Sequence, residues 1–208
     1  MVFSVSMAIV DYIPVLFFAF FSTILLRDLY NKMSKGAFAL LSCGNIMVFF
    51  AGLFKATWKL LYALGVCDFV KLNECFFPMQ SLGFALSGLA MVSLLLVPQG
   101  SQTALAVAPV IFSGTMLFVA VMALGMTGLC LGLMVIALKM KDRKAALLFI
   151  AAWVLQLGMG YLSSKDFSSA AMDWAAQGVN ILGQGAQLLG VMSLHKAGLE
   201  KPDSFPVK

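Results

Sequence analysis

The sequence predicts an all-α protein whose helices cross a membrane several times, and three features of the chain carry that prediction. Hydrophobic residues make up 62% of the chain and charged residues 11%, with a mean hydropathy of +0.97. Soluble domains contain about 45–50% apolar and about 25% charged residues. The apolar residues also form runs near the roughly 20 residues that cross a bilayer. Finally, Lys and Arg cluster beside these runs, so the net charge of +5 indicates membrane orientation and not nucleic acid binding.

The apolar runs predict five clear membrane-spanning helices, at 7–26, 36–53, 76–97, 145–161 and 171–194. The first run has neither a basic leader nor a cleavage site, so we expect it to be retained as a helix. The stretch 103–138 is harder to interpret, because it is too long for one ordinary helix and barely long enough for two. Its one internal turn signal is Gly125-Met126-Thr127-Gly128.

The positions of the basic residues favour two helices in that stretch. Basic clusters follow the first span, the stretch 103–138 and the last span: Arg27, Lys32 and Lys35; Lys139, Lys141, Arg143 and Lys144; and Lys196, Lys201 and Lys208. Seven helices place all three clusters on one side of the membrane, whereas six place the second and third opposite the first. We therefore expect seven helices, with six as the alternative, in one transmembrane domain (1–198) with a short cytoplasmic tail (199–208). The N-terminus would lie outside the cell membrane and the C-terminus in the cytoplasm.

A weak internal repeat supports this count. When the third span is laid on the last with an offset of one hundred residues, matches appear at Gln80 with Asn180, Gly83 with Gly183, Ser87 with Gln187, and Ser93-Leu94 with Ser193-Leu194. Three helices, a linker helix and three more in the same orientation would be a parallel repeat, which resembles the arrangement of SWEET sugar transporters and their relatives. The resemblance is architectural only. The paired Pro-Gln signature of the PQ-loop relatives is missing, because Pro98-Gln99 lies in a loop and Pro78-Met79-Gln80 is interrupted.

The last predicted helix carries a row of polar side chains on one face: Asp173, Gln177, Asn180, Gln184, Gln187 and, continuing the row, His195. At about 100° per residue they fall within roughly an 80° sector. A bare amide in hydrocarbon costs about 4–8 kcal/mol, so this face must meet protein or water. Single amides also join membrane helices, at about 0.6–2 kcal/mol per hydrogen bond. The number of aligned groups favours a water-accessible or ligand-binding cavity over packing contacts.

Polar groups on other helices complete the predicted site. Asn45 lies near the middle of the second span, and Trp153 and Gln156 share a face of the sixth. Gln80 is included because it aligns with Asn180 in the internal repeat. The predicted substrate-binding residues are Asn180, Gln184, Gln177, Gln187, Asn45, Gln156, Trp153 and Gln80, and the predicted approach or gate residues are Asp173, His195 and Lys59. Amides and an indole without a carboxylate at mid-depth suit a neutral polar or zwitterionic solute.

Two further features have competing interpretations. Lys55 and Lys59, with Trp58 between them, could attract an anion, although snorkelling at a helix end is the favoured interpretation. Cys67 and Cys75 bracket a loop predicted to lie outside the cell, and the sequence leaves open whether a disulfide joins them.

These features predict a transporter, or the substrate-binding subunit of one, with the lipid bilayer, a small solute and possibly an energising or signalling protein as partners. The sequence predicts no cofactor, metal or nucleic acid partner. An enzyme is disfavoured, because the chain has one histidine and no hydrolase, metalloprotease or nucleotide-binding motif. The alternatives are a sensor or assembly subunit and, with less support, a lipid-modifying enzyme that uses Asp173 or Glu74.

Overall fold

The computed structural model describes residues 4–96, 115–163 and 170–201, and all regular secondary structure in these residues is helical. The helices are α1 (Val5–Val10), α2 (Tyr12–Leu29), α3 (Lys35–Ala63), α4 (Val70–Glu74), α5 (Phe76–Leu96), α6 (Thr115–Lys139), α7 (Arg143–Ser163) and α8 (Ala170–Lys196). The predicted spans 36–53, 145–161 and 171–194 lie in α3, α7 and α8, and 7–26 lies in α1 and α2. The span 76–97 coincides with α5 up to residue 96, and residue 97 lies outside the described residues. Local capping explains two of the boundaries, because Ser34 caps α3 at the Ala37 N–H and Asp142 caps α7 at the Ala145 N–H.

Four segments are long and apolar enough to cross a membrane: Val5–Leu29, Lys35–Ala63, Val70–Leu96 and Met116–Lys139. The first joins α1 to α2 through Asp11, and the third joins α4 to α5. Helices α7 and α8 are 21 and 27 residues long and pack beside these segments. The lengths and compositions are those of a helical membrane protein.

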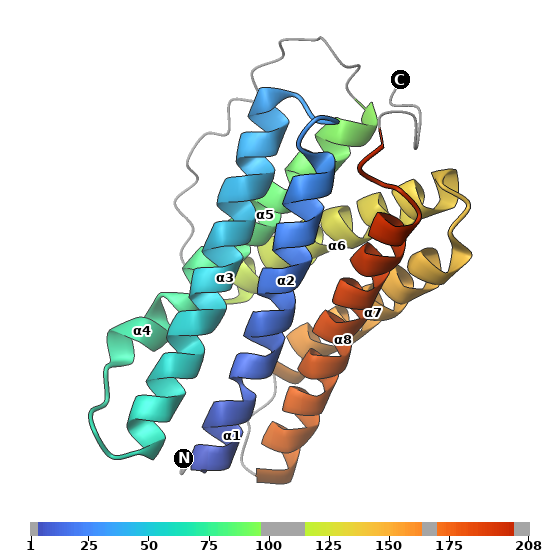
Figure 1. Cartoon of the computed structure of the whole chain (residues 1–208). Coiled ribbons are helices and arrows are strands. Elements are labelled where there is room, and N and C mark those ends of the chain that lie inside the picture. The colour runs from blue at the N-terminus through green and yellow to red at the C-terminus, as the bar shows by residue number, and fades with distance from the viewer. Residues whose placement is uncertain (1–3, 97–114, 164–169, 202–208) are drawn as a thin grey trace.

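The six long helices form a closed ring in the order α2, α3, α5, α6, α7, α8, and α8 returns to pack against α2 (Figure 1). The short α4 lies beside α3 and α5, outside the ring. One end of the ring holds the basic clusters of the α2–α3 loop, the α6–α7 loop and the end of α8; we call it the basic end. In the half nearest this end the ring is filled by large side chains with no measurable exposure, including Phe21, Leu25, Leu133, Phe149 and Leu194.

Helices α5 and α6 run in the same direction, although they are neighbours in the chain. Ser81 donates to the Phe118 carbonyl at 2.7 Å, and Gly132 lies against Met91 further along both helices. Both helices therefore end at the basic end. The residues between them, 97–114, lie outside the described residues.

The turn predicted at Gly125-Met126-Thr127-Gly128 is wrong, because α6 runs through these residues without a break. The glycines serve helix packing instead. A Cβ added to Gly125 would lie 2.3 Å from the Phe84 carbonyl carbon, and one added to Gly88 would lie 2.4 Å from the Gly125 carbonyl oxygen. Glycine in a membrane helix therefore marked a close helix contact here and not a turn. The rest of the stretch 103–138, up to residue 114, lies outside the described residues.

Replacing Gly125 with Ala is expected to lower the stability of the protein, because the new methyl group overlaps the α5 backbone and forces the two helices apart. Overpacking of this kind costs about 1–3 kcal/mol. Thermal unfolding in detergent would measure it. Gly158→Ala is the control, because no atom lies within 4 Å of a Cβ at Gly158. Equal stability of the two variants would contradict the close contact.

Candidate functional site

A cavity of about 640 Å³ lies inside the ring, in the half away from the basic end, and all six long helices line it. Ligand sites commonly have volumes of about 300–1,000 Å³. Most of the lining is apolar. The polar or amphipathic side chains in the lining are Asp11, Lys55, Trp58, Lys59, Gln80, Gln156, Asp173, Gln177, Asn180 and Gln184.

The cavity has a charged outer part, at the end away from the basic end, and an aromatic floor. Asp173 lies in the first turn of α8, and Gln184 lies eleven residues deeper along the same helix, a rise of about 16 Å. At the floor, the rings of Phe18 and Phe84 meet edge to face with centroids 6.1 Å apart. Met126 lines the cavity at this level and lies against the next layer of the core. The floor separates the cavity from the packed basic end.

The polar row of α8 faces the interior of the ring. Its members lie at three depths: in the cavity, below the cavity floor and at the basic end. Asp173, Gln177, Asn180 and Gln184 line the cavity. The next member, Gln187, lies below the floor and is fully buried, and its amide points at Cys130 Sγ (3.5 Å) and Met126 Sδ (3.8 Å). The last member, His195, belongs to a charge network at the basic end.

Four cavity-lining glutamines each carry a buried amide atom without a hydrogen-bonding partner in the described residues: Gln80 Oε1, Gln156 Nε2, Gln177 Nε2 and Gln184 Oε1. They come from three different helices, α5, α7 and α8. A buried polar group left unpaired costs about 1–3 kcal/mol, and most such groups in proteins are paired. Two unpaired acceptors and two unpaired donors around one cavity therefore indicate a site for a polar ligand or for water.

The outer part of the cavity carries four charged side chains, of which two form an ion pair. Lys59 Nζ lies 2.6 Å from Asp11 Oδ2, and this pair links α3 to the junction of α1 and α2. Lys55 Nζ lies 3.8 Å from the centroid of the Phe76 ring. In the part of the chain that the structure describes, Lys55 has no carboxylate partner within 4 Å, and Asp173 has no basic partner within that distance.

Three of the predicted substrate-binding residues lie outside the cavity lining. Asn45 accepts a hydrogen bond from Ser87 Oγ (2.9 Å) between α3 and α5, and Trp153 Nε1 donates to Thr127 Oγ1 (3.0 Å) between α7 and α6. Gln187, between α8 and α6, is the third. All three join neighbouring helices.

From the sequence, snorkelling at a helix end is the favoured interpretation of Lys55 and Lys59. Both Lys55 and Lys59 line the cavity. Their spacing of four residues, which places them on one helix face, was the available signal. The aromatic floor was not predicted, because Phe18 and Phe84 are two of 18 phenylalanines with nothing local to distinguish them.

The loop between α3 and α5 lies at the end opposite the basic end. Cys67 and Cys75 are both exposed and free, so the disulfide left open by the sequence is not formed in this structure. Trp58 Nε1 donates to Asp68 Oδ1 at 2.9 Å and ties the loop back to α3.

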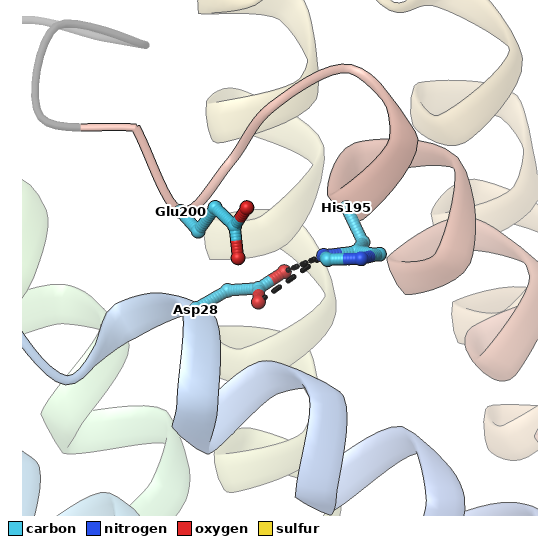
Figure 2. A group of neighbouring side chains, drawn as sticks. All are labelled: Asp28, His195 and Glu200. Carbon is cyan, nitrogen blue, oxygen red and sulfur yellow. Dashed lines mark hydrogen bonds and ion pairs between the residues drawn. The ribbon is translucent and has the colours of Figure 1, made fainter.

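A second group of polar side chains lies at the basic end, where Asp28, His195 and Glu200 converge (Figure 2). Their ligand atoms lie within 4.8 Å of one another, a spacing that would suit a metal ion. The carboxylate of Asp28 is fully buried, whereas His195 and Glu200 are partly exposed.

The contacts of Arg27 favour an ion network over a metal site. Its Nη2 atom lies 2.9 and 3.0 Å from the two ring nitrogens of His195, and its Nε lies 3.2 Å from Asp28 Oδ1. A neutral His195 that donates from Nδ1 to Asp28 and accepts from Arg27 at Nε2 satisfies both ring nitrogens. A metal cation bound to the His195 ring would be repelled by the positive charge of the Arg27 guanidinium. The network thus joins the ends of α2 and α8.

Two more contacts close the basic end. Lys32 donates to the carbonyl of Lys201, and Ser193 Oγ donates to Asp142 Oδ2 at 2.6 Å. Leu199, at the start of the predicted cytoplasmic tail 199–208, is fully buried. Residues 199–201 therefore pack against the bundle, and residues 202–208 lie outside the described residues.

Replacing Asp28 with Asn is expected to destabilise the protein by about 1–3 kcal/mol, because the buried charge that Arg27 and His195 share is removed while both partners remain. Thermal unfolding would measure the loss. Glu74→Gln is the control, because Glu74 pairs with Lys71 on the surface. An Asp28→Asn variant as stable as the control would show that the network contributes nothing.

Comparison with protein-family models, with curated protein sequences and with solved structures finds no match for this chain. What the protein does therefore has to follow from the chemistry of its own cavity and charge network.

Proposed function

We propose that the protein is a membrane transporter, or the substrate-binding membrane subunit of one, for a small neutral polar or zwitterionic solute. The observation that carries the proposal is the set of four unpaired amide atoms around a single cavity inside a ring of helices. Asn45 and Gln187 each also have one unpaired amide atom, but neither residue lines the cavity, and both make a contact to a neighbouring helix. Unpaired donors and acceptors beside a cavity are available to a solute instead.

The unequal ends of the ring fit one state of an alternating-access cycle. The cavity lies in the half away from the basic end, and a packed core and a charge network close the basic end. Because basic clusters mark the cytoplasmic side, the cavity belongs to the outer half. This orientation places the N-terminus outside and the C-terminus in the cytoplasm, with the plasma membrane as the proposed location.

An internal repeat of three helices is compatible with the ring. The proposed repeats are α2–α3–α5 and α6–α7–α8, which would be related by an axis along the membrane normal. Gly83 of α5 packs against α3, and Gly183 of α8 packs against α7, so equivalent glycines meet the equivalent neighbour. A parallel repeat of this kind needs a crossing between the halves, which accords with seven spans.

Energy for transport would come from a gradient of the solute or from a separate protein partner. The chain has no nucleotide-binding loop. The carboxylates in the cavity lining, Asp11 and Asp173, lie in its outer part and not at mid-depth. A buried mid-membrane carboxylate is the usual element of proton coupling.

A sensor or assembly subunit is the competing function, and one observation favours it. Asn45 and Trp153 make interhelical hydrogen bonds, so this chain does use polar groups to join helices. The lipid-modifying enzyme gains no support, because Glu74 pairs with Lys71 on the surface, away from Asp173 in the cavity lining.

The transporter proposal predicts that a solute raises the thermal stability of the purified protein. The solutes to test are sugars, amino acids, vitamins and small anions. A solute at 100 times its dissociation constant should stabilise the protein by about 2.7 kcal/mol. The double variant Asn180→Leu, Gln184→Leu should lose this shift, because both amides line the cavity.

Gln187→Leu is the matched control, because Gln187 lies on the same face of α8 but below the cavity floor. It should keep the solute-induced shift. If no solute stabilises the parent and the double variant is equally stable, the protein is better explained as a subunit that waits for a protein partner.

The proposed orientation predicts that a membrane-impermeant maleimide labels intact cells through Cys67 and Cys75, which are exposed at the end opposite the basic clusters. The Cys67→Ser, Cys75→Ser variant should lose this labelling. A cysteine added to that variant at Lys144, in the basic α6–α7 region, should react only after permeabilisation. Labelling of the Lys144→Cys variant in intact cells would reverse the orientation.

A further inference from the structure

We infer that the solute is a zwitterion with an apolar body, whose anionic group binds Lys55 and whose cationic group binds Asp173. This inference rests on the proposed function and narrows it to one chemical class. It starts from the charges of the outer cavity and not from the amides that support transport.

The charged side chains of the outer cavity differ in whether they form a close ion pair. Asp11 and Lys59 are 2.6 Å apart and neutralise each other. Lys55 and Asp173 line the same cavity, on α3 and α8, and in the described part of the chain neither has an oppositely charged partner within 4 Å. One positive and one negative charge are therefore available to a ligand.

The surroundings of Lys55 suit it to an anionic group. Its ammonium lies 3.8 Å from the centroid of the Phe76 ring and 5.8 Å from that of Phe77. The ring faces attract the cation without using its N–H donors in conventional hydrogen bonds. The ammonium is thus positioned by the aromatic rings and keeps donors for a carboxylate.

The position of Asp173 suits it to a cationic group. It lies in the first turn of α8, where the helix dipole stabilises a negative charge. Its carboxylate lines the cavity and makes no hydrogen bond to a described residue. An ammonium group of the solute would supply the missing countercharge.

Charge balance favours a zwitterion over the other solute classes. Asp173 would repel an anionic solute, and Lys55 would repel a cationic solute. A neutral solute would leave both side chains without an oppositely charged partner. A zwitterion satisfies both. The remaining lining supports an apolar body, because Phe18, Phe84 and Met122 line the cavity beneath the charged part.

The test compares three ligand series on the purified full-length protein by isothermal titration calorimetry. The first consists of zwitterions with increasing charge separation, from apolar α-amino acids to unbranched ω-amino acids. The other two are the corresponding amines and carboxylic acids. At least one zwitterion should bind about tenfold more tightly than its matched amine and acid, because both of its charges are paired.

Two charge-removing variants identify the groups. Lys55→Met should weaken zwitterion binding about tenfold and leave the matched amine no weaker, whereas Asp173→Asn should weaken the zwitterion and leave the matched acid no weaker. Lys71→Met is the control, because Lys71 is exposed and lies outside the cavity lining. Lys55→Gln and Asp173→Ser serve as replacements if a first variant does not fold.

The outcomes separate the two levels of the proposal. Tight binding of an uncharged solute that is unaffected by either variant would overturn the zwitterion inference and leave the transporter proposal unaffected. Equal binding of a zwitterion and its matched amine or acid would do the same. Failure of the parent protein to bind any zwitterion, amine, acid or neutral solute would overturn both.

Discussion

Hydrocarbon cannot hydrogen-bond to an amide, and this constraint determines how α8 sits in the bundle. The helix carries five polar groups along one face between Asp173 and Gln187, so that face has to point into the ring, where Gln177, Gln184 and Gln187 are in fact buried. The opposite face then meets the membrane through exposed side chains such as Leu182 and Leu189. The location of the cavity follows from this rotation, because the row of amides forms one wall of it. The other walls come from the remaining five long helices, of which α5 and α7 contribute one glutamine each.

The Phe18–Phe84 floor separates two uses of the same chemistry. Below it, polar groups make contacts between helices. The amide of Gln187 points at two sulfur atoms of α6, and Ser87 of α5 donates a hydrogen bond to Asn45 of α3. Above it, amide atoms of Gln80 and Gln184 have no described partner and belong to residues that line the cavity, whereas the unpaired Asn45 Nδ2 and Gln187 Oε1 below it belong to residues that contact neighbouring helices. Packing of amides and binding of a solute are therefore not exclusive explanations of the polar row on α8. The depth of each residue relative to the floor decides which explanation applies.

Much of this arrangement follows from sequence periodicity. The parts that could not be predicted all have the same physical reason. Apolar length locates the helices, and the spacing of four and three residues identifies the inward face of α8, because both are properties of a single helix. Asn45 and Gln187 are different: each is inward-facing and buried, but whether a cavity or a neighbouring helix meets it depends on the partner helix. The turn predicted at Gly125 is wrong for the same reason. A glycine in an apolar run permits either a turn or a close helix contact, and only the presence of Phe84 and Gly88 on α5 decides for the contact.

The two seams between the proposed halves of the ring are built differently, and this limits how the proposed transport could proceed. At the α5–α6 seam, the backbones meet at Gly88 and Gly125, where a single methyl group would not fit, so the two helices must move together. At the α2–α8 seam, the contact near the floor is looser, with Phe17 at an ordinary 3.5 Å from a Cβ built on Gly185, and the basic end is joined by the Arg27–Asp28–His195 network. Charge networks can exchange partners with water at a membrane surface, whereas interlocked backbones cannot separate without losing their packing. In the proposed transport cycle, release of the solute toward the basic end would therefore proceed by opening the α2–α8 seam while α5 and α6 remain together as the pivot.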